Sequence, residues 1–555
     1  MKPFLQKIAE RLIDKFPEKM DHIAVVLPSK RSIVFLKHYL SNLITKPIFL
    51  PKFFSIEQFV EYISGYNVLD NISLQFHLYQ TYLKSNNLDQ ISFDKFIGWS
   101  NILLNDFNDV DRNLINPKHI FLNLREVKNL DNWGADPWSL SDPLLTNLQQ
   151  EYVSFYDHIY DWYLDFNQSL SNCNFAYQGM AYRKSAEKIV DFDFAFEKIW
   201  FVGLNALTKS EERIINSLKE KNIARVFWDA DEFYYNNSQH EAGEFLRVQK
   251  HKWNEINFEG VGNYFNQKKQ NFSIISCPKD VSQARAAGSI LSNLSDQDLK
   301  SSNTAIILAD ENLLYPVLNH LPENIKDINI TMGSPLSQYP LFSFFQHIFN
   351  MQLNAKQDQF HYKDFLDLIN HPIFIQFVGL DFVNSIKSKI VTENKVFISS
   401  EYILSKFEVN NENVSHIFYK WKDSKQAISS LRNIIYGLRN DLIGQRNSVS
   451  SEVIYTFHKC LRLIDDLFIT HNIFVKVNTF YKILNQLLSR EIVPFSGEPL
   501  KGVQLMGVLE SRTLDFKNLI ILSVNEGCLP KGDLKNSFIP YDLKKYFNIP
   551  TNKDH

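Results

Sequence analysis

The hydrophobic positions at the start of the chain alternate between helical spacing and short continuous runs. Residues 4–16 place apolar side chains three and four positions apart, which predicts an amphipathic helix. The β-branched run 22–27 predicts a buried parallel strand, because such strands are covered on both faces. The alternation continues with a helix over 33–43, a strand over 48–50 and a helix opened by the capping-box pair Ser55 and Gln58. An α/β fold is therefore expected.

The rest of the chain alternates between strand-like runs and two long helical stretches. The apolar runs lie at 198–203, 224–228, 272–276, 304–308, 503–508 and 518–524. This pattern predicts two α/β units with parallel sheets, each interrupted by a large helical insertion. The expected first unit is 1–67 with 192–262, around an insertion at 68–191, and the expected second is 271–340 with 500–555, around an insertion at 341–499.

Composition and charge exclude several classes of protein but do not indicate a catalytic activity. The 555 residues correspond to about three or four domains of ~150 residues, and 45% hydrophobic with 22% charged residues is ordinary globular usage. The formal net charge is −3, so a nucleic-acid site would have to be a local basic patch. Only 18 residues are Gly, less than half the typical share of about 7%, which argues against glycine-rich phosphate loops.

Targeting signals and cysteine chemistry are both weak in this sequence. Charged side chains interrupt the first 20 residues, so they lack the apolar core of a signal peptide, and no stretch reaches the roughly 18 apolar residues of a membrane span. We therefore expect a cytoplasmic protein without membrane contact. The cysteines form no Cys-x-x-Cys pair and are expected in core or incidental positions, namely Cys173, Cys277, Cys460 and Cys528.

Several familiar catalytic motifs do not occur. The dipeptide Gly-Lys is absent, which excludes the G-x-x-x-x-G-K-[ST] phosphate loop, and neither H-E-x-x-H nor G-x-S-x-G is present. The sequence thus provides no recognisable means of binding nucleotide phosphates, a catalytic zinc or a serine nucleophile.

The segment 503–530 resembles the motif V region of UvrD-like superfamily 1 helicases. It has a strand, a loop with the basic residue Arg512, the turn Leu514-Asp515-Phe516, a second strand and an exit at Glu526-Gly-Cys-Leu-Pro530. Two adjacent buried strands of an unrelated α/β domain would be the simpler interpretation. The order of these parts over 28 residues favours the helicase resemblance.

Weaker segments follow the helicase order upstream. Residues 24–32 resemble motif Ia, whose exit loop contacts nucleic-acid phosphates, and 329–335 occupy the place of the loop after motif IV. Residues 199–208 resemble motif II, but Val202 and Gly203 stand where an active enzyme has two acids. Residues 227–247 resemble motif III and contain Asp229 and Asp231, for which a structural turn is expected rather than a metal site.

The pattern is similar to the inactivated helicase region of AddB-like proteins, a PD-(D/E)XK nuclease family of DNA repair. This resemblance implies two RecA-like units, DNA as ligand and an AddA-like helicase–nuclease as partner. It implies no cofactor in this chain, with Mg²⁺ expected only for a nuclease domain beyond it, since motif VI and the nuclease region do not follow motif V here. The implied contacts to DNA phosphates come from Lys30, Arg31, Ser32, Arg512 and Thr513.

Two other functions stay open. The chain could be an active ATP-dependent translocase with an unrecognised nucleotide site, against which the missing Gly-Lys weighs. It could also be a protein-interaction scaffold for a partner helicase, which the near-neutral charge permits. A basic stripe joining Lys30 and Arg512 would favour DNA binding over the scaffold alone.

Acidic residues provide the remaining candidates. Asp106, Asp109 and Asp111 could hold a metal, but a solvated helix end is the expected role of this cluster. Acid-x-Lys triplets typical of nuclease sites are expected by chance in a chain this rich in charge. They occur at Glu126-Val-Lys128, Asp298-Leu-Lys300, Glu393-Asn-Lys395 and Asp515-Phe-Lys517.

Overall fold

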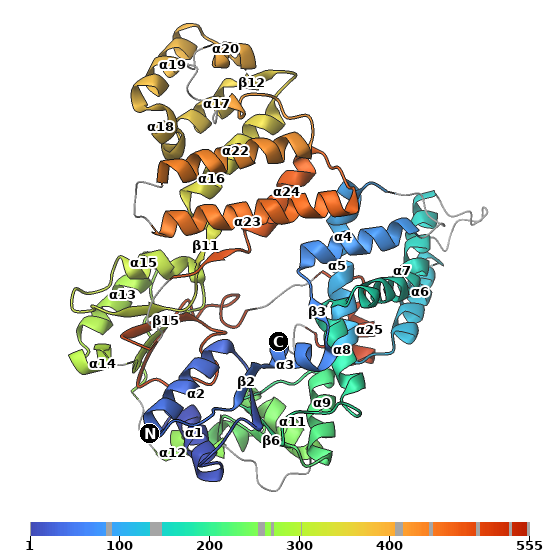
Figure 1. Ribbon diagram of the computed structural model, residues 1–555, viewed down its shortest axis with the longest axis vertical. Coiled ribbons are helices and arrows are strands. Elements are labelled where there is room, and N and C mark those ends of the chain that lie inside the picture. Colours follow the sequence, from blue (N-terminus) through green and yellow to red (C-terminus); the bar gives the residue numbers. More distant parts are fainter. Residues whose placement is uncertain are drawn as a thin grey trace. The chain divides into compact units, whose positions relative to one another are not determined.

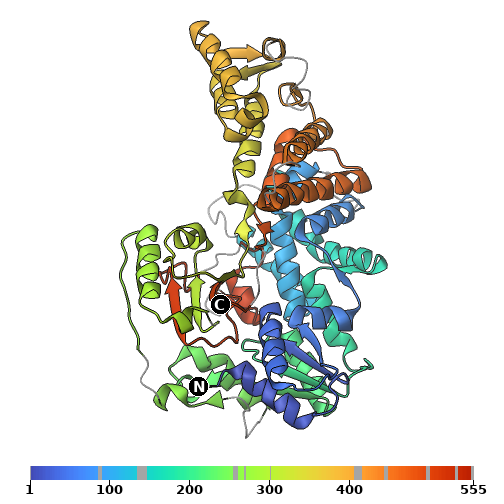
Figure 2. The same cartoon turned by 60° about the vertical axis from the view of Figure 1, so that its left-hand side comes forward.

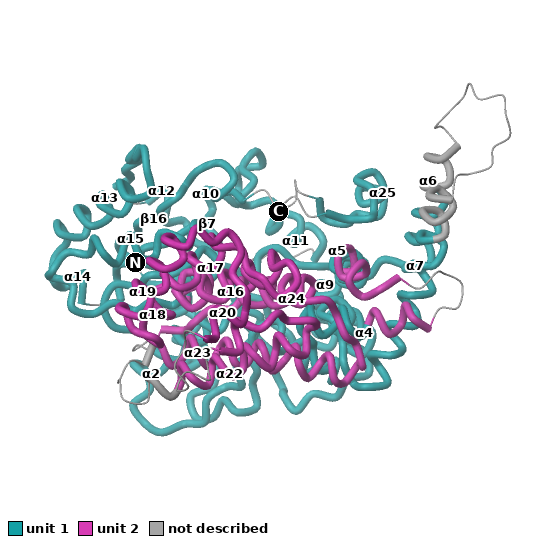
Figure 3. Tube along the Cα trace, turned by 90° about the horizontal axis from the view of Figure 1, so that it is seen from above, with its two compact units in different colours: residues 1–77, 101–332, 496–555 teal, residues 78–100, 333–495 magenta. Residues whose placement is uncertain are grey.

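The computed structural model describes residues 2–84, 91–133, 147–253, 261–267, 271–300, 302–405, 415–442, 448–495, 500–531 and 536–551 (Figure 1). The chain divides into two compact units. The first contains residues 1–77, 101–332 and 496–555, and the second contains residues 78–100 and 333–495 (Figure 3).

The first unit contains a four-stranded parallel sheet of order β2-β1-β5-β6, formed by β2 (Lys52–Ser55), β1 (Ile23–Leu27), β5 (Lys198–Val202) and β6 (Ala224–Phe227). All five residues of β1 are buried, as the continuous apolar run predicted. Helices α1 (Phe4–Lys15) and α2 (Lys30–Leu43) pack on one face, with a core that includes Val25, Trp200 and Phe227. Helices α3 (Ile56–Ser64), α8 (Gln178–Lys188) and α9 (Lys209–Glu220) pack together and cover the other face.

A helical region follows the strand β2 in sequence, as the periodicity of 68–191 predicted. It contains β3 (Asn67–Val68), α4 (Asn71–Lys84), α5 (Phe93–Arg112), α6 (Pro117–Trp133), α7 (Asn147–Asn172) and β4 (Phe175–Ala176). Short elements follow β6, namely β7 (Ala230–Asp231), α10 (Glu232–Tyr235), α11 (Glu244–Trp253), β8 (Val261–Gly262) and α12 (Tyr264–Gln267).

A second parallel sheet of order β10-β15-β9-β16 belongs to the same unit (Figure 2). Its strands are β10 (Ile328–Ile330), β15 (Val503–Gly507), β9 (Thr304–Leu308) and β16 (Asn518–Leu522). The associated helices are α13 (Asp280–Ser292), α14 (Asp296–Lys300) and α15 (Leu314–Leu318), whereas α25 (Tyr541–Tyr546) contacts α6 of the helical region. Since β9 and β15 are buried along their whole length, both central strands have the continuous apolar character expected of a parallel sheet.

Two predicted strands are wrong. Residues 48–50 are not a strand, and the corresponding strand of the first sheet is β2, which starts four positions later at Lys52 and ends at the capping-box residue Ser55. Residues 272–276 form no strand and pair with no neighbour in the described structure, and Phe272 and Ile274 are 83% and 89% exposed. Their β-branched, apolar pattern indicates strand propensity, but pairing depends on a neighbouring edge that the local sequence does not specify.

The two sheets share one unit because the turn after β15 packs into both. Leu514 and Phe516 contact the core of the first sheet and the small core around Ala305, Ile307 and Met506 in the second. The ring centroid of Phe516 lies 6.3 Å from that of Phe35 on α2, edge to face. The expected pair of separate α/β units is therefore one compact body by its contacts.

The second unit is helical, apart from short strands. Residues 78–100 contribute the end of α4 and the beginning of α5 to this unit. Its other elements are β11 (Ser334–Pro335), α16 (Pro340–Asn354), β12 (Gln359–His361), α17 (Tyr362–Ile369), α18 (Pro372–Val378), α19 (Leu380–Thr392), β13 (Phe397–Ser399), α20 (Ser400–Leu404), α22 (Ser424–Leu442), α23 (Ser448–His471), α24 (Val477–Leu488) and β14 (Ile492–Val493). In the part of the chain that the structure describes, none of the helices has the length and apolar character required to cross a membrane. The α/β class predicted from the sequence is confirmed.

Candidate nucleic-acid interface

The loops that follow β1 and β15 meet at the first residues of α2. Ser29 caps this helix, and its hydroxyl accepts from the backbone N–H of Ser32 at 3.1 Å. The hydroxyl of Ser32 donates to the carbonyl oxygen of Arg512 at 3.1 Å and lies 2.7 Å from the hydroxyl of Thr513. Segments 480 residues apart are thereby joined, and each of the joined segments carries an exposed cation, Lys30 or Arg512.

Two residues predicted to bind DNA have roles inside the chain instead. Ser32 is fully buried, and its hydroxyl contacts the loop of Arg512. The Arg31 guanidinium donates to Oε1 of the buried Gln504 at 2.6 Å, and its burial lowers the pKa of Arg31 to about 10. Sequence reasoning placed both on the loop surface because they follow Pro28. The structure puts them in the first turn of α2, against β15.

The glycine at position 203 has a steric explanation. Gly203 follows β5 with φ +70, and a Cβ added there would lie 2.2 Å from Cγ2 of Thr513. The preceding residue, Val202, is a fully buried strand residue. An acidic side chain at 203 would require a strained backbone and displacement of Thr513, so the acid pair of motif II does not fit this arrangement.

Asp515 of the Leu-acid-Phe turn caps a helix. Pro3 at the start of α1 provides no side-chain cap, and Oδ2 of Asp515 accepts from the backbone N–H of Phe4 at 2.7 Å. A carboxylate at this end of a helix is favoured by the helix dipole. Burial raises the pKa of Asp515, while the Phe4 hydrogen bond and the charge of Lys7 oppose this shift.

A cavity of about 890 Å³ lies at the carboxyl ends of β1, β5 and β6, within the first unit. The described residues that line it include Gly203 and Arg512, so the loop junction forms part of its wall. Its carboxylates are Glu57, Asp109, Glu211, Asp229, Asp231 and Asp515, and its cations are Lys7, Arg112 and Arg512. The excess of carboxylates opposes binding of a nucleoside triphosphate, because the anionic phosphates and the carboxylates repel each other in a partly enclosed site.

Asp229 and Asp231, which correspond to motif III, differ in their surroundings. Asp231 caps α10 by accepting from Phe233 N–H at 3.0 Å and also accepts from Tyr264 N–H at 2.6 Å, which is a structural role. Asp229 is accessible to solvent in the cavity wall. The surrounding protein raises the pKa of Asp229 to about 7, the charge of Asp515 adds to this shift, and Lys7 opposes it.

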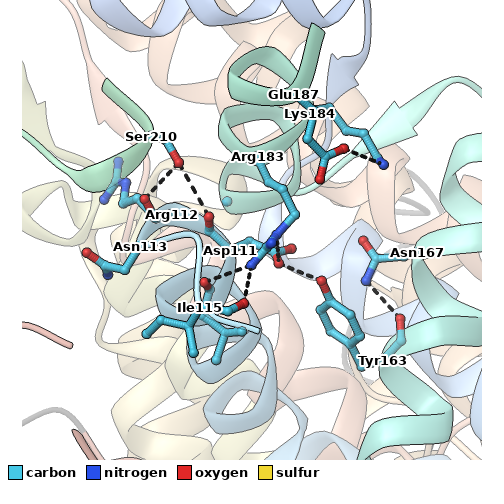
Figure 4. Close-up of polar contacts among 12 residues, drawn as sticks. Asp111, Arg112, Asn113, Ile115, Tyr163, Asn167, Arg183, Lys184, Glu187 and Ser210 are labelled. Atoms are coloured by element: carbon cyan, nitrogen blue, oxygen red, sulfur yellow. Dashed lines mark hydrogen bonds and ion pairs between the residues drawn. The ribbon is translucent and has the colours of Figure 1, made fainter. Parts of the chain in front are cut away.

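The expected solvated helix end around Asp111 is wrong, since this residue is buried at the end of α5 (Figure 4). Its Oδ1 accepts from Nε of Arg183 at 2.6 Å and from the hydroxyl of Tyr163 at 2.6 Å, and its Oδ2 accepts from the hydroxyl of Tyr177. Arg183 also donates to the carbonyl oxygen of Ile115 at 2.6 Å. This network ties α5 to α7 and α8.

The other two aspartates of the cluster have separate partners. Asp106 is buried and accepts from the Ser537 hydroxyl and, at 2.8 Å, from the Phe538 N–H. Burial raises the pKa of Asp106 to about 7 despite these hydrogen bonds. Asp109 is partly exposed and lies 3.9 Å from Nζ of Lys544. In the described residues no group of three His, Cys, Asp or Glu side chains is arranged to hold a metal.

Two of the four acid-x-Lys triplets contact each other. Lys517 of one triplet donates to Asp298 of another at 2.7 Å and lowers the pKa of Asp298. Glu393 and Lys395 pair with each other at 3.1 Å. Glu126 is on α6, and the side chain of Lys128 lies outside the described residues. All four cysteines are free thiols, with Cys460 buried and Cys173 exposed.

Comparison with known proteins provides no assignment: no family model and no curated protein matches the chain. The functional argument therefore depends on geometry. Sequence reasoning missed Gln504 and the buried partners of Asp111, because their contacts join segments that are distant along the chain. An apolar strand that contains a glutamine, as 503–508 does, is a weak signal for such an internal polar link.

Proposed function

We propose that this chain is a DNA-binding, helicase-like scaffold of the AddB-like kind that does not use ATP. The observation that supports it is the junction of the β1 and β15 loops through Ser32 and Arg512, since each of the two joined segments carries an exposed cation, Lys30 or Arg512. Lys30 is also the first residue of α2, whose amino-terminal dipole favours a phosphate. Contacts of this kind give affinity without sequence readout.

The absence of ATP chemistry in this proposal follows from the cavity. Phosphoryl transfer requires a phosphate cradle, a lysine and a metal held by acids. At the corresponding strand end are Val202, which is apolar and buried, and Gly203, which has no space for the side chain of an acid. A PD-(D/E)XK nuclease domain and an AddA-like partner are part of the same proposal, and they rest on the sequence resemblance alone.

The test is a double charge reversal, Lys30→Glu with Arg512→Glu. Fluorescence anisotropy with a labelled single strand is measured at several salt concentrations. We expect weaker binding and a salt slope reduced by about 0.7 for each lost phosphate contact. Unchanged affinity and slope would contradict the proposal and favour the interaction scaffold.

Two control variants separate this surface from general charge effects. Lys46→Glu with Lys326→Glu makes the same change in net charge at exposed lysines that precede β2 and β10, at the opposite ends of the strands. Arg31→Ala removes a cation whose guanidinium is directed to Gln504, and should destabilise the fold without changing the salt slope. Phosphate release from ATP that depends on DNA would instead favour the active motor.

A further inference from the structure

Helices α22 and α23 of the second unit form a cleft that no predicted site includes. Its volume is about 470 Å³, within the usual range of ligand pockets. From α22 it is lined by Ile435, Tyr436 and Arg439, and from α23 by Ser451, Ile454, Tyr455 and His458. The two isoleucines are buried and form its floor.

The aromatic side chains of the cleft are directed toward solvent. Tyr436 is 44% exposed and Tyr455 is 62% exposed, one on each helix. The ring centroid of Tyr436 lies 5.9 Å from that of His458, with an interplanar angle of 50°. Two tyrosines whose only role was to fill the core would be buried. Here two exposed rings line a cleft that also contains two buried isoleucines, and exposed rings of this kind can serve as a stacking platform.

The charge of the cleft is the opposite of that of the cavity in the first unit. No carboxylate is present in its described lining, and Arg439 is exposed. Other arginines nearby are already paired, Arg432 with Asp465 and Arg462 with Asp466. Among the described residues Arg439 makes no ion pair, so its guanidinium can accept an anion beside the rings.

We infer that this cleft binds an unpaired base of a single-stranded nucleic acid, with Tyr436 and Tyr455 stacking on the base and Arg439 contacting its phosphate. Single-stranded nucleic acid is favoured as occupant because each nucleotide carries both a flat aromatic base and an anionic phosphate. The base matches the aromatic side chains of the cleft, and the phosphate matches Arg439. The inference deepens the proposed function and rests on it, because it gives the DNA a second contact on different elements.

The experiment compares Tyr436→Ala and Tyr455→Ala with wild type, using one labelled single strand with bases and one with abasic sites. Loss of a stacked base should weaken binding about 5- to 150-fold. The salt slope should not change, because no phosphate contact is removed, whereas Arg439→Ala should reduce it by about 0.7. On the abasic strand, wild type and the tyrosine variants should bind equally.

Matched variants keep the test independent of folding. Tyr455→Phe retains the ring and should bind like wild type, whereas Tyr455→Leu keeps apolar area without a π-face and should bind like Tyr455→Ala. Tyr419→Ala removes a tyrosine of the same unit that is 54% exposed but lies outside the cleft, and should have no effect.

The possible failures are distinguishable. Wild type that does not bind single strands overturns both the proposed function and this inference. Wild type that binds, with Tyr436→Ala and Tyr455→Ala equal to Tyr419→Ala, overturns the stacking site and leaves the proposed function intact. A loss that persists unchanged on the abasic strand also overturns stacking, since no base is then involved.

Discussion

Arginine and tyrosine side chains have opposite surroundings in two regions of the molecule. Inside the first unit they bind partners within the chain, whereas in the α22–α23 cleft of the second unit they are exposed. In the first unit, Arg31 and Arg183 donate to groups inside the chain, and Tyr163 donates to a buried carboxylate. In the cleft, Tyr455 is mostly exposed and Arg439 has no ion-pair partner among the described residues.

The difference shows that the type of a residue predicts its role poorly unless its hydrogen-bond or ion-pair partner is also known. An arginine with a buried acceptor stabilises the fold, since a buried polar group without a partner is destabilising. An exposed arginine beside aromatic rings gains little for the fold and remains available to a ligand. Residues of the first kind should therefore affect unfolding, and residues of the second kind should affect binding.

The largest effect should come from Asp111→Ala. The change leaves the Arg183 guanidinium buried without its carboxylate, and breaking such a pair typically costs about 3–5 kcal/mol. Urea unfolding followed by circular dichroism should show a much lower midpoint.

Asp109→Ala is the matched control, because it removes the same residue type from the same helix. Asp109 is partly exposed, and 3.9 Å separate its carboxylate from Lys544, so the cost should be below about 1 kcal/mol. Equal midpoints for the two variants would break the comparison, because the buried network would then contribute no more than a surface charge.

A smaller effect is expected from Gly203→Ala, which tests how closely the loops pack. The left-handed backbone and the contact with Cγ2 of Thr513 together should cost about 2–3 kcal/mol. Adding Thr513→Ser removes that methyl group but keeps the hydroxyl near Ser32, and should restore about 1 kcal/mol.

Gly65→Ala provides the control for that pair. Gly65 also has a positive φ, +74, in the left-handed region, but no atom lies within 4 Å of a Cβ added there. Its cost should therefore be limited to the backbone term of about 1–2 kcal/mol. If Thr513→Ser fails to rescue Gly203→Ala, the steric account of Gly203 is wrong.

The sequence predicted elements better than partners. The continuous apolar runs at 22–27, 304–308 and 503–508 identified the central strands, because burial on both faces leaves a local signature. The run at 272–276 has the same signature and is unpaired, since strand pairing depends on a distant edge. The loops of Lys30 and Arg512 could be proposed from motif order, whereas the burial of Ser32 and Asp111 could not, because their partners lie 480, 52 and 72 residues away.

The smallest effect concerns charge, the last property in which the two regions differ. Asp229 has a pKa raised to about 7, mainly because protein surrounds it in the cavity, with Asp515 adding to the shift and Lys7 opposing it. The unfolded chain should have the ordinary value of about 3.9, so between these values the folded state binds more protons. The stability from this proton is complete below about pH 4 and is lost as the pH rises through about 7.

The test is Asp229→Asn, whose side chain has no such proton to lose. Its free energy of unfolding should equal that of wild type near pH 4 and exceed it at pH 8. Because the side chain is accessible to solvent, the gain should stay below about 1 kcal/mol. Urea midpoints of both proteins at pH 4, 6 and 8 measure it. A difference that does not vary with pH would mean that the carboxylate is solvated like a surface charge, and the cavity would then lose its contrast with the cleft of the second unit.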